Sequence, residues 1–202
     1  MYIEDDSDIK IFGSKEKDNS ENETLVEIEK QHENGNIALA KKLGAMLSDE
    51  LLPENSISQF GFVDGRDVPL ESEELRFQRR VLMAFCVEVG LDIYIPNTIV
   101  SSTAVDEFHS RIETEHPDFY KKVMNMGAFS FYYLGLRTEG RAEKAIGAVF
   151  AKLCREENKK LYADFGEALF IYFMDTIESA VRELGFSDLE EEKDTRTAAV
   201  GG

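Results

Sequence analysis

The chain has 202 residues, of which 43% are apolar and 10% aromatic, enough for one substantial hydrophobic core. Lys and Arg number 23 against 40 Asp and Glu, which gives a formal net charge of −17. Such a field repels phosphate backbones and anionic lipid head groups, so composition argues against proteins that bind nucleic acid or a membrane surface.

Acidic residues are enriched at both ends of the chain. Residues 1–24 hold eight acidic and three basic side chains, and residues 187–202 hold five and two, so the central segment carries a net charge of −9. The two ends contain too few apolar side chains to offset the entropy of ordering them. We expect flexible acidic tails at 1–23 and 187–202, on either side of one helical globular domain at 24–186.

Cysteine usage and the N-terminal sequence bear on the compartment. Cys86 and Cys154 each lie in an apolar helical pattern and form no CxxC pair, so both are expected to be small core residues. The chain begins without the basic and apolar regions of a secretory signal, and no apolar run approaches the roughly 20 residues of a membrane span. We therefore expect a cytoplasmic protein without a membrane partner.

The first half of the chain predicts two or three helices. Apolar residues from Thr24 to Pro53 follow a 3.6-residue period through Gly35, which predicts one long helix or two abutting helices. Residues 53–70 are rich in turn-forming types and predict a connection, with a short extended piece at 57–63.

The next helix is expected to begin at Ser72, whose hydroxyl can cap exposed backbone amides, and to end near Gly90. Residues 92–96 are bounded by proline and predict a linker or an edge strand. A further helix is expected to begin with a cap at one of residues 101–103 and to end before Pro117.

The second half of the chain predicts helices at 117–124, 128–136, 140–156 and 159–184. The aromatic residues of 128–136 also suit a strand, but its helical neighbours favour a helix. The segment 159–184 is apolar nearly all round, as expected of a helix with partners on several sides, and Gly185 is a typical stop. The predicted fold class is all-α, with about six or seven helices packed around this C-terminal helix.

One pattern suggests a metal site. His109, Glu113 and His116 are spaced to lie along one helical face, and Glu29 with His32 forms a second Glu-x-x-His pair. Two such pairs with further glutamates make a di-iron carboxylate bundle, and these ligands suit a divalent transition metal.

Pairs of a histidine and an acidic residue at helical spacing are common by chance in this sequence, which weakens the metal hypothesis. With 40 acidic residues among 202, a histidine has an acidic neighbour at i±3 or i±4 about 60% of the time. His116 also precedes Pro117 at a helix end, where a cationic side chain is favoured without any metal. Exposed or capping histidines are the favoured interpretation, and we expect no cofactor.

Two other groups of residues are candidates for binding. Arg76, Arg79 and Arg80 form the densest basic cluster and suit an anion or a carboxylate of a partner, although ion pairing with nearby glutamates is the simpler role. Aromatic side chains suit either an apolar ligand pocket between helices or plain core packing, which is favoured; they are Phe129, Phe131, Tyr132, Tyr133, Phe170, Tyr172 and Phe173.

Familiar catalytic motifs are absent from the sequence. It contains no GxxxxGK[ST], GxGxxG, GxSxG, HExxH or calcium-loop pattern, which favours a non-enzymatic protein. The first functional hypothesis is an interaction or regulatory protein whose acidic surface binds a protein partner or itself. The alternatives are a metal-dependent carboxylate–histidine enzyme and a helical protein that binds an apolar small molecule in a pocket.

Overall fold

The structure is a computed structural model, and it describes residues 14–51, 69, 72–138, 140–187 and 189. Within these residues the chain forms eight α-helices and no strand, which confirms the all-α prediction with slightly more helices than expected. The helices are α1 (Ser14–Glu33), α2 (Asn36–Leu51), α3 (Glu73–Tyr94), α4 (Thr98–Glu115), α5 (Pro117–Met126), α6 (Ala128–Leu136), α7 (Ala142–Leu153) and α8 (Lys160–Leu184).

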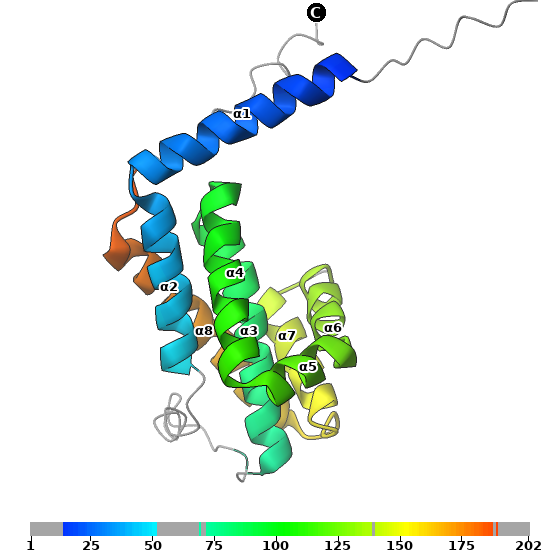
Figure 1. Ribbon diagram of the computed structural model, residues 1–202. Helices are drawn as coiled ribbons and strands as arrows, with labels where there is room; N and C mark the ends of the chain where they lie inside the picture. Colours follow the sequence, from blue (N-terminus) through cyan, green and yellow to red (C-terminus); the bar gives the residue numbers. More distant parts are fainter. Residues whose placement is uncertain (1–13, 52–68, 70–71, 139, 188, 190–202) are drawn as a thin grey trace, which may run out of the picture.

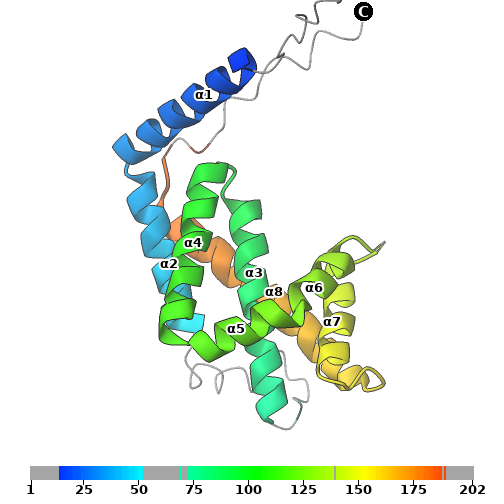
Figure 2. The ribbon, with the colours of Figure 1, turned by 45° about the vertical axis from the view of Figure 1, so that its right-hand side comes forward.

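Helices α3 and α8 each pack against several other helices. Helix α3 contacts α2, α4, α6, α7 and α8, and more than half of its residues are buried. Helix α8 contacts α2, α3 and α7, so the expectation that the C-terminal apolar helix has partners on several sides is confirmed. In Figures 1 and 2, α2 and α4 lie on one side of α3, α6 and α7 lie on the other, and α1 crosses the end of this group.

The core contains both cysteines and most of the buried aromatic rings. Phe85 of α3 stacks on Tyr132 of α6, with ring centroids 5.0 Å apart and an interplanar angle of 28°. Cys86 and Cys154 are free and buried, as expected, and burial raises the pKa of the Cys86 thiol well above its ordinary value. Tyr132, Phe170 and Phe173 are core residues, which agrees with the packing interpretation of the aromatic segments.

The helix starts are set by local capping. Ser72 caps α3 as predicted, since its Oγ accepts a hydrogen bond from the Leu75 amide at 3.1 Å. The predicted start of α4 at residues 101–103 is wrong: Asn97 is the cap, and its Oδ1 accepts from the Val100 amide at 3.1 Å. The predicted linker or strand at 92–96 is wrong for Asp92, Ile93 and Tyr94, which continue α3.

A polar network fixes the corner between α1 and α2. Gly35 adopts a φ of +78°, which favours glycine and separates the two helices, so of the two alternatives that the sequence left open the structure has two abutting helices. Asn97 and Gln31 each donate a side-chain hydrogen bond of 2.7 Å to Glu27 Oε1, and Asn36 donates one of 2.5 Å to Gln31 Oε1. These bonds connect α1 to the starts of both α2 and α4.

Two glycines allow helices to pack closely. A Cβ added to Gly44 of α2 would lie 2.3 Å from the Ala104 carbonyl oxygen of α4. A Cβ added to Gly147 of α7 would lie 2.3 Å from the Ala163 carbonyl oxygen of α8. Both helix pairs therefore depend on the absence of a side chain at one position.

Several sequence predictions fall on parts of the chain outside the described residues. These include the extended piece at 57–63 and most of the connection at 53–70 and of the tail at 187–202. The N-terminal segment is described only from Ser14, and there it belongs to α1, which begins well before Thr24. Among the helices described, none combines the length and hydropathy needed to cross a bilayer.

Candidate functional site

An open apolar cleft of about 540 Å³ lies between the start of α3 and the helices α6 and α7. Its apolar lining comes mostly from α6 and α7: Met126, Phe131, Leu134, Gly135, Ala145, Ala148, Val149 and Leu153. Its polar lining residues are Glu74, Gln78, Thr138, Lys152 and Arg155. The volume falls in the range of small-molecule sites, about 300–1,000 Å³.

Small residues shape the cleft. A Cβ added to Gly135 of α6 would lie 3.3 Å from Val149 Cγ2, so this glycine lets α6 approach α7 closely. Gly127, with a φ of +61°, ends α5 and turns the chain into α6. On α7, Ala145 and Ala148 line the cleft with methyl groups, which leaves room between the two helices.

Large apolar side chains remain exposed along the cleft. Leu134 is 66% exposed, Phe131 44% and Met126 37%, and all three line it. Neighbouring exposed apolar side chains in one concave region mark a surface suited to binding, whereas scattered ones need no explanation. The cleft is therefore the strongest candidate for a functional site in the described part of the chain.

The polar groups of the cleft come from α3 and from the end of α7. Gln78 is fully buried, its Nε2 donates to Glu74 Oε1 at 2.7 Å, and its Oε1 accepts no hydrogen bond within the described residues. The Lys152 ammonium lies 5.6 Å from the centroid of the Phe131 ring. A buried acceptor that lacks a donor is costly, so this Gln78 oxygen lowers stability at the edge of the cleft.

The cysteine nearest to the cleft in the sequence is not an activated nucleophile. Cys154 is adjacent in sequence to the lining residues Leu153 and Arg155, but burial, then the charge of Glu74, raises the pKa of its thiol to about 12. The thiol is therefore protonated at neutral pH and is a poor nucleophile. The lining residues include neither a histidine nor a serine.

The structure separates the predicted metal ligands. Asn97, at the start of α4, contacts Glu27 of α1, so Glu29 and His32 lie near that end of α4. His116 caps the opposite end, and the 18 residues of α4 span about 27 Å. Within the described residues, no group of three or more His, Cys, Asp or Glu side chains is arranged to hold a metal ion.

His109 has a different partner from those that its sequence neighbours suggest. Its Nε2 lies 2.8 Å from Glu88 Oε1 on α3, and Tyr133 of α6 donates to the other Glu88 oxygen at 3.2 Å. The His109 ring also packs edge-on against Tyr120 of α5, while Glu113 is exposed. Glu88 therefore connects α3 to both α4 and α6.

The arginine cluster is divided between the core and a second hollow. Arg79 is buried, whereas Arg76 and Arg80 line a hollow of about 720 Å³ at the start of α3. The other lining residues are Ser72, Glu73, Glu74, Phe77 and Lys122. The Arg80 guanidinium lies 4.2 Å from the centroid of Phe119, so stacking on an aromatic ring is part of its role.

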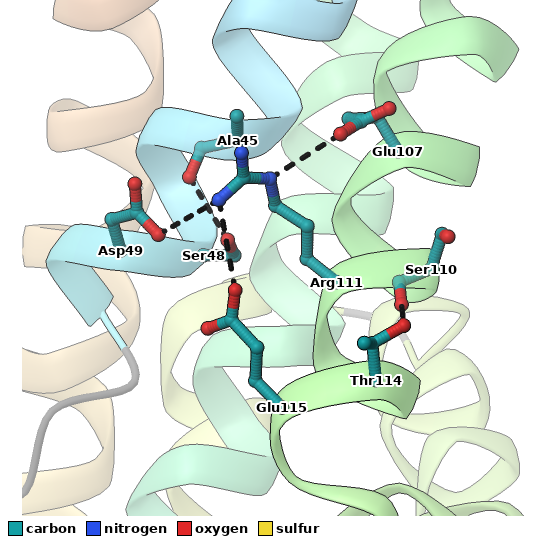
Figure 3. A network of polar contacts seen from close by, with 8 residues as sticks. All are labelled: Ala45, Ser48, Asp49, Glu107, Ser110, Arg111, Thr114 and Glu115. Atoms are coloured by element: carbon teal, nitrogen blue, oxygen red, sulfur yellow. Dashed lines mark hydrogen bonds and ion pairs between the residues drawn. The ribbon is translucent and has the colours of Figure 1, made fainter.

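An acidic surface region joins α2 to α4 (Figure 3). Arg111 Nη1 lies 3.2 Å from Asp49 Oδ1 and 3.7 Å from Glu115 Oε1, and its Nε lies 3.3 Å from Glu107 Oε1. Three carboxylates therefore surround one guanidinium, and the region keeps a negative charge.

Comparisons of the chain with protein-family models, curated proteins and solved structures find no significant match.

Proposed function

We propose that the chain is a non-enzymatic binding protein that takes an apolar small molecule into the cleft between α3, α6 and α7. The observation that carries the proposal is a cleft of suitable volume whose lining is mostly apolar, with exposed Phe131 and Leu134 beside it. Transfer of these side chains from water onto a ligand is favourable by about 25 cal/mol per Å² of apolar area.

The test uses a neutral apolar probe, decanol, with binding measured by native mass spectrometry and by titration calorimetry. Ala148→Trp places a large ring within the cleft and is expected to abolish binding, because Ala148 lines the cleft on an exposed side of α7. Ala38→Trp makes the same change at an exposed site on α2 and is expected to leave binding intact. Absence of decanol binding to the wild type, or equal behaviour of the two variants, would overturn the proposal.

A second candidate function is the interaction hypothesis, in which the same face or the acidic surface binds a protein partner or another copy of the chain. Leu134 is 66% exposed, and Phe131 lies three residues before it on the same helical face, a spacing used in helix-in-groove recognition. Sedimentation over a concentration series tests self-association. A dimer that Leu134→Asp weakens and Ile93→Asp does not would favour it, since Ile93 is similarly exposed on α3.

A further inference from the structure

The charged groups of the cleft indicate which kind of apolar molecule fits it, provided that the proposed function holds. Two cations, Lys152 and Arg155, and one carboxylate, Glu74, line the cleft, so its lining carries a local net charge of +1 in a chain of net charge −17. Lys152 and Arg155 are both exposed and form no ion pair in the described part of the chain.

Three other cations nearby, Arg141, Lys159 and Lys160, are paired with carboxylates. Lys159 lies 2.8 Å from Glu156, and Lys160 lies 2.5 Å from Asp164. Arg141 pairs with Glu143. Because acidic side chains outnumber basic ones in this chain, cations that lack a carboxylate partner and lie together beside a cleft are available to an anionic ligand.

The backbone holds Arg155 in an unusual conformation. Helix α7 ends in a Schellman motif: the Glu156 amide donates to the Ala151 carbonyl at 2.8 Å and the Arg155 amide donates to the Lys152 carbonyl at 2.9 Å. Arg155 takes the left-handed position of this motif with a φ of +59°, and it is the only non-glycine residue with a positive φ in the described chain. Gly127 and Gly185 take the left-handed position after α5 and α8.

Arginine at this position costs about 1–2 kcal/mol of backbone strain that glycine would avoid. The position sets the side chain at the end of α7, where it lines the cleft, and the two hydrogen bonds of the motif hold the backbone there. Residues other than glycine in a left-handed conformation are concentrated at active sites, ligand-binding sites and switch regions.

We propose that the ligand of the cleft is an amphipathic anion, an alkyl chain with a carboxylate, whose chain lies between α6 and α7 and whose carboxylate is held by Lys152 and Arg155. At about 30 Å³ for each water-sized group, the cleft accommodates on the order of 18 non-hydrogen atoms, so a medium-chain carboxylate fits. Glu74 faces the same cleft but accepts a hydrogen bond from Gln78, and its charge weakens the attraction without reversing it.

The test compares three probes with one alkyl chain, decanoate, decanol and decyltrimethylammonium, near pH 7, where a carboxylate is ionised. Decanoate is expected to bind about 5- to 10-fold more tightly than decanol, and added salt is expected to reduce the difference. Decyltrimethylammonium is expected to bind most weakly. The double variant Lys152→Gln, Arg155→Gln is expected to lower decanoate affinity below that of decanol, because Glu74 then repels the carboxylate, and to leave decanol affinity unchanged.

The matched control is Lys144→Gln with Arg137→Gln, which removes two exposed cations from α7 and the end of α6 that do not line the cleft. Equal binding of decanol and decanoate to the wild type would overturn the charge assignment and leave the proposed function standing. Tightest binding of the ammonium probe would assign the headgroup to Glu74 and would overturn it also. Absence of decanol binding to the wild type would overturn the proposed function itself.

Discussion

Asn36 holds the backbone of Ser187 with both ends of its side-chain amide, although 151 positions separate the two residues. Its Nδ2 donates to the Ser187 carbonyl at 2.5 Å, and its Oδ1 accepts from the Ser187 amide at 3.1 Å. Asn36 is fully buried and also bonds Gln31 of α1. One side chain at the start of α2 therefore joins the N-terminal helix to the segment after α8.

The first prediction concerns this residue. Asn36→Ala leaves the buried Gln31 without this partner and removes both bonds to the Ser187 backbone, so the free energy of unfolding is expected to fall by about 1–3 kcal/mol. Urea denaturation followed by circular dichroism measures the change. Asn34→Ala, at an exposed position of the same corner, is the control and is expected to change stability by less than about 0.5 kcal/mol. Equal effects of the two substitutions would contradict the assigned role.

The second prediction concerns the contact between α2 and α4. Gly44→Ala is favoured by helix propensity by about 1 kcal/mol, but its Cβ would lie 2.3 Å from the Ala104 carbonyl oxygen. We expect the steric cost to exceed the gain in helix propensity, so that the free energy of unfolding falls by about 1–3 kcal/mol net. Ala38→Gly, at an exposed site of the same helix, measures the propensity term alone. A Gly44→Ala protein with an unchanged or higher unfolding midpoint would show that the helices separate at little cost.

The third prediction concerns alkaline pH. Burial, then the charge of Glu88 and the hydrogen bond to it, raises the pKa of Tyr133 from 10.0 to about 12. Between these values the unfolded chain has lost the proton that the folded chain retains, so the free energy of unfolding falls as pH rises from about 10 to about 12. Below pH 10 this contribution is fully present.

Tyr133→Phe removes the Tyr133 contribution and is expected to flatten the decline of stability over this range, measured by urea denaturation at several pH values. Tyr172→Phe is the matched control, because Tyr172 on α8 is 43% exposed and Tyr133 is 41% exposed. If the two phenylalanine variants lose stability with pH in parallel, Glu88 does not hold the Tyr133 proton.

The fourth prediction concerns the end of α7. Arg155→Gly relieves the left-handed backbone and is expected to raise the free energy of unfolding by about 1 kcal/mol, while it lowers decanoate affinity. Arg155→Ala removes the same guanidinium without relieving the backbone, so it is expected to lower decanoate affinity equally without the gain in stability. Thermal unfolding and calorimetry separate the two effects. A glycine variant no more stable than the alanine variant would show that Arg155 is not strained.

Local sequence patterns predicted the helices better than their ends. Ser72 and Gly185 mark the limits of α3 and α8 because capping involves residues only a few positions apart. The start of α4 was predicted wrongly because three hydroxyl residues at 101–103 compete with Asn97 as caps on propensity alone. Asn97 is fully buried and also bonds Glu27, and that tertiary contact is invisible in the sequence.

The histidine pattern shows the limit of spacing as a guide to a site. His109, Glu113 and His116 follow a helical period, yet His109 bonds Glu88 of α3. The period fixes which residues share a helical face, but it does not say which other helix that face meets. The signal for the cleft was similarly incomplete: Phe131 was a candidate pocket residue, while Tyr132 and Phe173 from the same set are buried in the core.

By itself, the sequence determined the all-α class, most helix positions and the burial of both cysteines, because these depend on apolar periodicity and on residues near one another in the chain. Only the tertiary structure decided where the candidate site lies. Glu74, Leu134 and Arg155 come from three separate segments, and they line one cleft only because α6 and α7 pack beside the start of α3. Long-range packing of this kind leaves no periodic pattern in the sequence, because which helix packs against each helical face depends on the arrangement of all the helices together.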